Sequence, residues 1–244
     1  MKPHLLMPMA GAGSRFYKKG YNLPKPLIEI AGKPFFYWAT RSIEKFVDVK
    51  DITFIVLKEH VNTFSIDLHI QQYFPSAKIV IIPEVTAGPV FTCLKGLQDI
   101  KDNNAVIFND CDHMFRSDSL NNFLKKADTE VDGALLTFES NCANYSYVQY
   151  DDLSNIRGTI EKKAVSDHAI SGAYYYSSAD LFKKIAQTYI DECPYNETFL
   201  SGMYNIMCKN NMYIKDFLVD FHVEFGTPDE YEQAKKSRYF KDLL

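Results

Sequence analysis

The chain has 244 residues, of which 46% are hydrophobic and 24% charged, values typical of a folded globular protein rather than a disordered one. Its formal net charge is −4, and no run of lysine or arginine is longer than two residues, so a nucleic-acid-binding surface is not expected. No apolar run approaches the roughly 18 residues of a membrane span, so membrane insertion is not expected either.

The cysteines and the N-terminus bear on the compartment. Five cysteines are present, an odd number, and none forms a C-x-x-C pair, which favours reduced thiols. Lys2 followed by "HLLMPMAGAG" resembles a secretory signal, but its apolar part is short, is interrupted by Pro8 and continues into Arg15. We therefore expect a cytoplasmic protein.

In the first 140 residues, apolar runs of strand length alternate with segments of helical spacing. Strands are predicted at 4–10, 52–57, 78–83, 105–110 and 133–138, and helices at 34–47, 61–74, 89–100 and 117–127. In the first helix, Phe36, Ala39, Ile43 and Phe46 recur at helical spacing. This alternation is typical of a mostly parallel sheet that is covered by helices.

After residue 140 the pattern changes. The segments 146–152, 156–165 and 170–178 alternate apolar and polar residues, as antiparallel strands do. Helices are predicted again near 179–190, 197–209 and 228–240. The whole chain is therefore predicted to be one α/β domain, with a Rossmann-like, mostly parallel mixed sheet flanked by helices.

Three polar turns follow predicted strands, at 11–15, 84–89 and 110–113. In open α/β sheets, ligands bind outside the carboxyl ends of the strands. We expect one cleft to collect all three turns.

The first turn, Gly11 to Arg15, is neither a P-loop nor a complete dinucleotide fingerprint, because Phe16 stands where the third glycine would be. Glycines let backbone N–H groups approach an anion closely, and Arg15 adds a planar fork of donors. Lys25 lies between two prolines, which restrict the local backbone. The turn is interpreted as a polyphosphate cradle, and a basic surface loop is the alternative.

The stretch "PMAGAGSRF", followed by "PKPLIEI" and "GKP", resembles the opening of the nucleotidyltransferases that make activated sugars and alcohols. The version here is most similar to a subgroup from bacterial capsule and surface-polysaccharide pathways. The resemblance implies a glycosyltransferase-A-like fold for nearly the whole chain. It also implies a nucleotide-binding half at 1–140 and an acceptor-binding half at 141–244.

The resemblance implies a nucleotide site in two parts. The triphosphate would be wrapped by the first loop, with Arg15 and Lys25 as catalytic cations; its residues are Ala10, Gly11, Ala12, Gly13, Ser14, Arg15 and Lys25. The base would be held by Glu84, Ala87 and Gly88. The turn at 84–89 is short, which favours a pyrimidine, CTP or UTP; it is also an ordinary turn in which Pro89 begins a helix.

The segment "VIFNDCDHMF" resembles the family's metal-binding turn and places Asp112 at the metal-binding aspartate. With Asp110 it forms a D-x-D, and Asp110 is assigned to nucleotide binding. Carboxylates with phosphate oxygens suit Mg²⁺, with Mn²⁺ as the alternative. Helix capping is the structural alternative, and a zinc site at Cys111 and His113 is not expected because a second ligand pair is missing.

The segment "TIEKKAV" resembles the family's E-K-P motif, with Lys163 in place of the proline. The resemblance implies that Glu161 contacts the acceptor's hydroxyls or amine and that Lys162, a third catalytic cation, contacts its phosphate. Gly172 would allow close approach of the substrate. Glu197 is placed at the first residues of a helix that faces the acceptor.

The segment "HVEFGTPDE" resembles the family's W-x-D-x-G-T-P motif, whose aspartate is the second metal ligand. Glu224 stands at that position. Thr227 and Pro228 also suit the start of a helix.

These motifs predict a metal-dependent nucleotidyltransferase that joins an NTP to a phosphorylated sugar or small alcohol and releases pyrophosphate. Two alternatives remain open: a glycosyltransferase of the same fold that uses a nucleotide sugar, and a non-catalytic nucleotide-binding domain. The sequence leaves the acceptor and the assembly state open, a homo-oligomer included.

Overall fold

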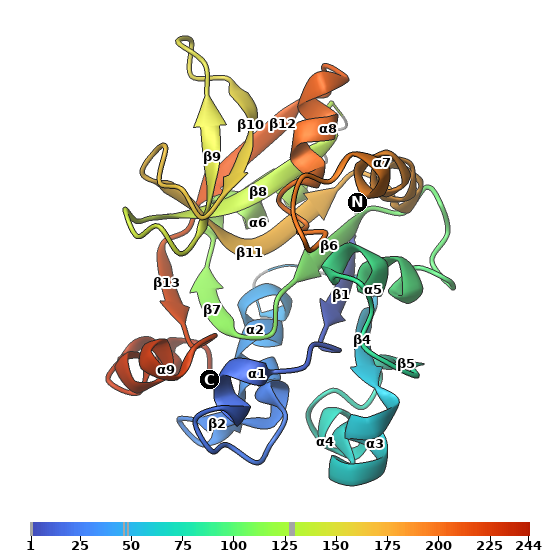
Figure 1. Cartoon of the computed structure of the whole chain (residues 1–244), viewed down its shortest axis with the longest axis vertical. Helices are drawn as coiled ribbons and strands as arrows, with labels where there is room; N and C mark the ends of the chain where they lie inside the picture. Colours follow the sequence, from blue (N-terminus) through green and yellow to red (C-terminus); the bar gives the residue numbers. More distant parts are fainter. Residues whose placement is uncertain (1, 46, 48, 127–129) are drawn as a thin grey trace.

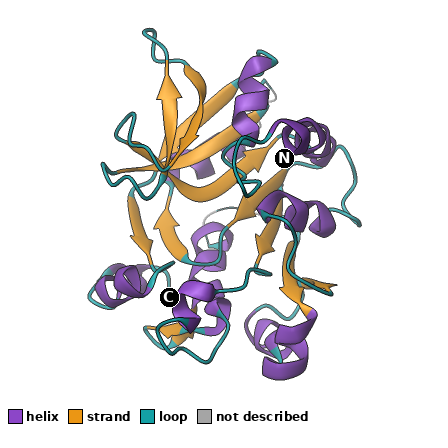
Figure 2. Ribbon diagram, in the orientation of Figure 1, coloured by secondary structure: helices purple, strands orange, loops and turns teal. Residues whose placement is uncertain are grey.

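The computed structural model describes residues 2–45, 47, 49–126 and 130–244. Figure 1 shows the course of the chain through these residues, and Figure 2 shows helices on both sides of a central sheet. The fold is a single α/β domain with a mostly parallel mixed sheet, as the sequence predicts.

Among the described residues the main sheet has nine strands, and one path through it runs β12-β8-β11-β6-β1-β4-β5. The strands β9 and β10 branch from the first part of β11, where Ala169 pairs with Tyr147. The nine strands are β1 (His4–Pro8), β4 (Ile52–Leu57), β5 (Lys78–Ile82), β6 (Val106–Asn109), β8 (Gly133–Glu139), β9 (Ser146–Tyr150), β10 (Ile156–Glu161), β11 (His168–Tyr176) and β12 (Ile214–Leu218).

The strand β1 is parallel to its neighbours β4 and β6, whereas β11 is antiparallel to β6, β8 and β9. The predicted strands before residue 140 are therefore confirmed as the parallel part, although β8 at 133–139 pairs antiparallel with β11. The three alternating segments after residue 140 are confirmed as antiparallel strands.

Successive residues of the central strands face opposite sides of the sheet, and each side has its own core. Leu5 and Met7 lie in the core covered by α2, α4 and α6, whereas Leu6 lies in the core covered by α5, α7 and α8. These helices are α2 (Phe35–Glu44), α4 (Ile66–Tyr73), α6 (Asp118–Lys126), α5 (Pro89–Gly96), α7 (Ala179–Glu192) and α8 (Met203–Lys209).

A third core joins the two ends of the chain. Phe16 of the short α1 (Ser14–Tyr17) packs with Phe35, Phe225 and Phe240. Three further parts of the chain complete this third core. They are a two-stranded ribbon of β7 (His113–Arg116) and β13 (Phe221–Glu224), and a small hairpin of β2 (Glu29–Ile30) and β3 (Lys33–Pro34). The third part is the pair of C-terminal helices, α9 (Pro228–Ala234) and η2 (Tyr239–Asp242). The sequence prediction did not include the ribbon, the hairpin or β12.

The predicted helix at 61–74 is wrong in one respect. The segment forms two helices, α3 (Lys58–Phe64) and α4, because Ser65 between them has left-handed backbone angles of φ 50° and ψ 40°. The helix predicted at 228–240 likewise ends at Ala234. Of the residues in the predicted helices, Phe46 and residue 127 lie outside the described residues.

All five cysteines are free thiols. In the part of the chain that the structure describes, no helix is both long enough and apolar enough to cross a bilayer.

Candidate active site

The glycine turn follows β1 directly and is fixed by its neighbours. Met9 and Ala10 are buried, and Gly13 takes the left-handed φ of 61° just before α1. A Cβ atom added at Gly13 would lie 3.5 Å from both Cβ and N of Lys25, so the turn and the Lys25 segment are in contact. Phe16, which breaks the dinucleotide fingerprint, is the buried anchor of this loop.

Lys25 begins a short 3-10 helix, η1 (Lys25–Leu27), with Pro24 before it and Pro26 inside it. Its Nζ lies 2.7 Å from Oδ2 of Asp112, and about three quarters of each side chain is shielded from solvent. Burial alone would lower the pKa of Lys25, but the Asp112 carboxylate outweighs it and holds this pKa above its ordinary value. The predicted phosphate lysine and the predicted metal aspartate therefore meet.

The acidic turn after β6 is held by β11. The backbone N–H of Asp110 donates to the carbonyl of Gly172 at 2.9 Å, and Gly172 has a φ of 87°. A Cβ atom at Gly172 would lie only 2.8 Å from Oδ2 of Asp110, so glycine is required here. Burial and the nearby negative charge of Asp112 raise the pKa of Asp110 to about 7.

Asp112 contacts the segment that follows β13. Its carbonyl accepts from the backbone N–H of Phe225 at 3.0 Å, and a Cβ atom at Gly226 would meet its Oδ2 at 2.5 Å. Burial alone would raise the pKa of Asp112, but Lys25 more than compensates and lowers it. The glycine of the G-T-P motif therefore lets the chain pass directly over the aspartate that the sequence assigns to a metal.

Glu224 pairs in register with His113, and its carboxylate accepts a hydrogen bond from the hydroxyl of Tyr145. Burial raises the pKa of Glu224 to about 8; the Tyr145 hydrogen bond opposes this rise, and the charges of Glu230 and Asp112 add to it. The carboxylates of Glu224 and Asp112 are thus within electrostatic reach of each other.

His113 and Cys111 are buried and have structural surroundings. His113 Nδ1 lies 3.1 Å from Nε2 of His222, and its Nε2 lies 3.1 Å from Oδ1 of Asn109. Burial lowers the pKa of His113 to about 4 and raises the pKa of Cys111 to about 12, which disfavours a thiolate ligand.

The side chains around the acidic turn are chemically suited to a hard divalent cation, because Asp110, Asp112 and Glu224 are all carboxylates. The charge of Asp112 acts on both Asp110 and Glu224, so Asp112 is the neighbour that the other two share. In the described residues no three His, Cys, Asp or Glu side chains stand ready-arranged around one point. Instead, Asp112 forms an ion pair with Lys25, and Glu224 accepts a hydrogen bond from Tyr145.

The turn assigned to the base leaves Glu84 and Ala87 exposed. Gly88 is packed so tightly that an added Cβ would lie 2.4 Å from Oγ1 of Thr198. Pro89 starts α5, as predicted, and the N–H of Val90 donates to the carbonyl of Thr198 at 3.2 Å.

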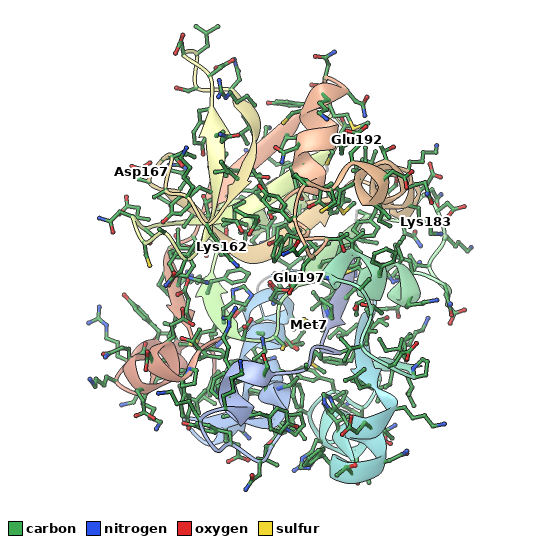
Figure 3. The ribbon with its side chains drawn as sticks, viewed as in Figure 1. Met7, Lys162, Asp167, Lys183, Glu192 and Glu197 are labelled. Atoms are coloured by element: carbon green, nitrogen blue, oxygen red, sulfur yellow. The ribbon has the colours of Figure 1, made fainter. Side chains whose placement is uncertain are left out.

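That contact explains one wrong expectation. Glu197 is expected at the start of a helix, but α8 starts only at Met203. Thr198 turns instead toward Gly88, so Glu197 lies exposed in the loop between α7 and α8. In Figure 3, Glu197 and Lys162 are both labelled in the central part of the molecule.

On the acceptor side, Glu161 ends β10, and its Oε1 accepts hydrogen bonds from the hydroxyls of Ser146 and Ser201. Lys162 has a left-handed φ of 55°, and its N–H donates to the carbonyl of Tyr145 at 3.0 Å. Its exposed side chain carries Nζ 5.9 Å from the centroid of the Phe199 ring.

The structure thus brings Gly13, Lys25 and Asp112 together and joins Asp110 to Gly172. Arg15 is exposed and has no ion-pair partner within residues 2–45, 47, 49–126 and 130–244. Sequence reasoning missed Tyr145, Glu230 and Thr198. Only Glu230 could have been found from the sequence, because it is an acidic residue just after the G-T-P turn. Tyr145 and Thr198 make their contacts with residues that are distant in the sequence, so they are found only in the folded chain.

Comparisons with known proteins show the family and the fold of this chain. The sequence profile of the family described as "Nucleotidyl transferase" matches residues 6–238. Among curated proteins, a search finds no match.

Several solved structures share the fold. The nucleoside-diphosphate-sugar pyrophosphorylase from Vibrio cholerae RC9 is 22% identical, with a TM-score of 0.82 over 96% of this chain and 100% of its own. A UDP-glucose pyrophosphorylase complexed with UDP-glucose is 17% identical, with a TM-score of 0.75 over 99% and 100% of the two chains. HddC from Yersinia pseudotuberculosis is 21% identical, with a TM-score of 0.67 over 97% and 99%.

Proposed function

The chain belongs to the nucleotidyl transferase family, and from this premise we propose that it joins an NTP to a phosphorylated sugar or small alcohol and releases pyrophosphate. The observation that carries the proposal is the contact between Lys25 and Asp112, 2.7 Å apart, beside the glycine turn. It unites the residues assigned to the phosphates with the residue assigned to the metal.

The reaction is an in-line displacement. An oxygen of the acceptor phosphate forms a bond to the α-phosphorus of the NTP, and the bond from that phosphorus to the bridging oxygen of the β-phosphate breaks. The second pKa of a phosphate monoester is about 6, so the nucleophile is largely dianionic at neutral pH and needs no strong base. The protein's task is to position two anions and offset their charge.

This chain's residues can divide that task. Arg15 and Lys25 would neutralise the departing pyrophosphate, and Lys162 would hold the acceptor phosphate. Asp112 and Glu224, with Asp110 beside them, would hold Mg²⁺ or Mn²⁺. When bound, the ion would offset negative charge on the phosphate oxygens.

The finer assignment is a pyrimidine nucleotide and a role in capsule or surface-polysaccharide precursors. The first part is supported by the short turn at 84–88, which Thr198 holds closely, and a protein of the same fold is known with UDP-glucose. The second part is supported by the resemblance of the opening motif to capsule-pathway enzymes. The reaction would take place in the cytoplasm, where NTPs are available.

The test is a panel of each NTP with phosphorylated sugars, polyols and amino alcohols, with Mg²⁺ or Mn²⁺, and pyrophosphate release as the readout. We expect release with at least one pair, and activity lower by at least about a hundredfold in Arg15→Ala and Asp112→Ala, since each removes a charge used in phosphoryl transfer. Arg157→Ala, an exposed arginine at the start of β10, is the matched control and should keep wild-type activity.

The other outcomes discriminate among functions. Glycosyl transfer from a nucleotide sugar without pyrophosphate release would indicate the glycosyltransferase alternative. Nucleotide binding with no turnover for any pair would indicate a non-catalytic domain. Near-normal turnover in either variant would refute the role given to that residue.

A further inference from the structure

Glu161 is held by two serines on a single oxygen. Ser146, directly opposite it on β9, donates to Oε1 at 2.6 Å, and Ser201 donates to the same Oε1. In both bonds the serine hydroxyl donates and the Glu161 oxygen accepts, so both hydroxyl hydrogens point at Glu161. The two bonds fix the carboxylate both along the strand and toward α8.

The second serine is itself rigidly placed. Ser201 is only 1% exposed, and its carbonyl accepts from the hydroxyl of Thr159 at 2.8 Å. The N–H of Thr159 donates to Oδ1 of Asn205 at 2.7 Å, which ties the start of α8 to β10. Ser201 therefore cannot follow Glu161 if the carboxylate turns, and it acts as a fixed point.

The other carboxylate oxygen is left open. Oε2 of Glu161 has no hydrogen-bond partner in the part of the chain that the structure describes, and it is not among the fully buried unpartnered atoms there. This oxygen is therefore available to accept a hydrogen bond from a bound molecule.

We propose that Ser146 and Ser201 are positioning residues that hold Glu161 through Oε1, so that Oε2 accepts a hydrogen bond from a hydroxyl or ammonium group of the acceptor. This inference rests on the proposed function and makes it more specific. The acceptor class is a phosphate monoester that carries a second, hydrogen-bond-donating group. Because the serines act through Glu161, their loss changes how the acceptor is held and not how the NTP is held.

The experiment starts with the acceptor that the pyrophosphate-release panel identifies. Ser146→Ala and Ser201→Ala should each raise the KM for that acceptor about 3- to 30-fold, which is less than the full worth of a hydrogen bond to a charged group because each serine acts only through Glu161. The KM for the NTP should stay within about twofold, because neither serine contacts the nucleotide loops. Ser166→Ala is the matched control: its hydroxyl donates to the carbonyl of Val148 at 2.7 Å on the same β9 strand, and it should change neither constant.

A double-mutant cycle separates positioning from a merely structural role. In a Glu161→Ala background, Ser146→Ala should add less than about twofold to the acceptor KM, since its only route to the acceptor has been removed. A serine that simply joins β9 to β10 would have the same effect in both backgrounds. Unchanged acceptor KM in both serine variants of an active enzyme would overturn the proposal.

A readout without turnover keeps the two hypotheses apart. In crystal structures of the wild type and of Ser146→Ala/Ser201→Ala, the Glu161 carboxylate should change its orientation. If it keeps the same orientation, the positioning role is refuted whether or not the enzyme is active. If the panel yields no pyrophosphate while the carboxylate does turn, the proposed function fails and the serines' hold on Glu161 stands.

Discussion

At the scale of single residues, two basic side chains that are largely shielded from solvent differ in whether a charged partner offsets their burial. Lys25 meets the carboxylate of Asp112 at 2.7 Å, so each charge offsets the other where water is scarce. His60 has no such partner: it is 3% exposed, and its Nδ1 has no hydrogen bond in residues 2–45, 47, 49–126 and 130–244. Burial lowers the pKa of His60, so this side chain takes up a proton at a lower pH in the folded chain than in the unfolded one.

This difference predicts a pH effect on stability. When the pH falls below the ordinary histidine pKa of about 6.5, the unfolded chain takes up a proton at His60 before the folded chain does, so the free energy of unfolding falls. His60→Leu should remove this loss, and its advantage over wild type should grow by up to about 1.4 kcal/mol per pH unit until the lowered folded-state pKa is reached. Urea denaturation at about pH 7 and about pH 5 measures it.

His69→Leu, at an exposed position on α4, is the control for this measurement and should follow the wild-type pH profile. Parallel pH profiles of His60→Leu and wild type would contradict the prediction.

At the scale of elements, Ser65 decides that one predicted helix becomes two. Its left-handed angles redirect the chain between α3 and α4, so Ile66 and Ile70 of α4 reach the core beneath α2. The periodicity of 61–74 is that of an uninterrupted helix, and serine is a weak signal for a break. A left-handed residue with a side chain is strained, and glycine is the residue that takes this conformation without cost.

Ser65→Gly should therefore stabilise the protein by about 0.5–1 kcal/mol, because the relief of strain exceeds the added freedom of the unfolded chain. Asn62→Gly, an exposed residue inside α3, should instead destabilise it by about 0.3–0.5 kcal/mol. Chemical denaturation of both variants compares the signs. Destabilisation by Ser65→Gly equal to that of Asn62→Gly would show that Ser65 is not strained.

At the scale of the whole molecule, the third core ties the loop that contains the glycine turn to the C-terminus. Phe16 of that loop and Phe240 of η2 belong to one cluster, and the Phe240 ring lies 4.8 Å from the Trp38 ring, centroid to centroid. Figure 1 shows the C-terminus beside α1 and α9, in agreement with this packing. The loop that would hold the triphosphate is thus supported by the last residues of the chain.

Phe240→Ala should lower the free energy of unfolding by about 3 kcal/mol, because it removes a fully packed aromatic ring and leaves a cavity. If the protein turns over an NTP, its KM should rise in the same variant, since Phe16 loses support. Lys241→Ala, one residue along and exposed, is the matched control for both measurements. A free energy of unfolding within about 0.5 kcal/mol of wild type would show that η2 does not support this core.

The sequence by itself determined the alternation of strands and helices and the turns to which the chemistry is assigned. Both depend on local patterns: apolar periodicity, as in β4, and turn residues such as Gly13 and Pro89. It could also place Gly11 to Arg15, Asp110 and Asp112 at strand ends, because the carboxyl ends of parallel strands share one edge of the sheet.

Only the tertiary structure decided which side chains meet. Lys25 and Asp112 are 87 residues apart, Tyr145 and Glu224 are 79 apart, and Glu161 and Ser201 are 40 apart. Such pairs depend on strand register and on how helices dock, which no local pattern encodes. For the same reason the short β7–β13 ribbon was missed: each strand has four residues, and it forms only when its distant partner lies beside it.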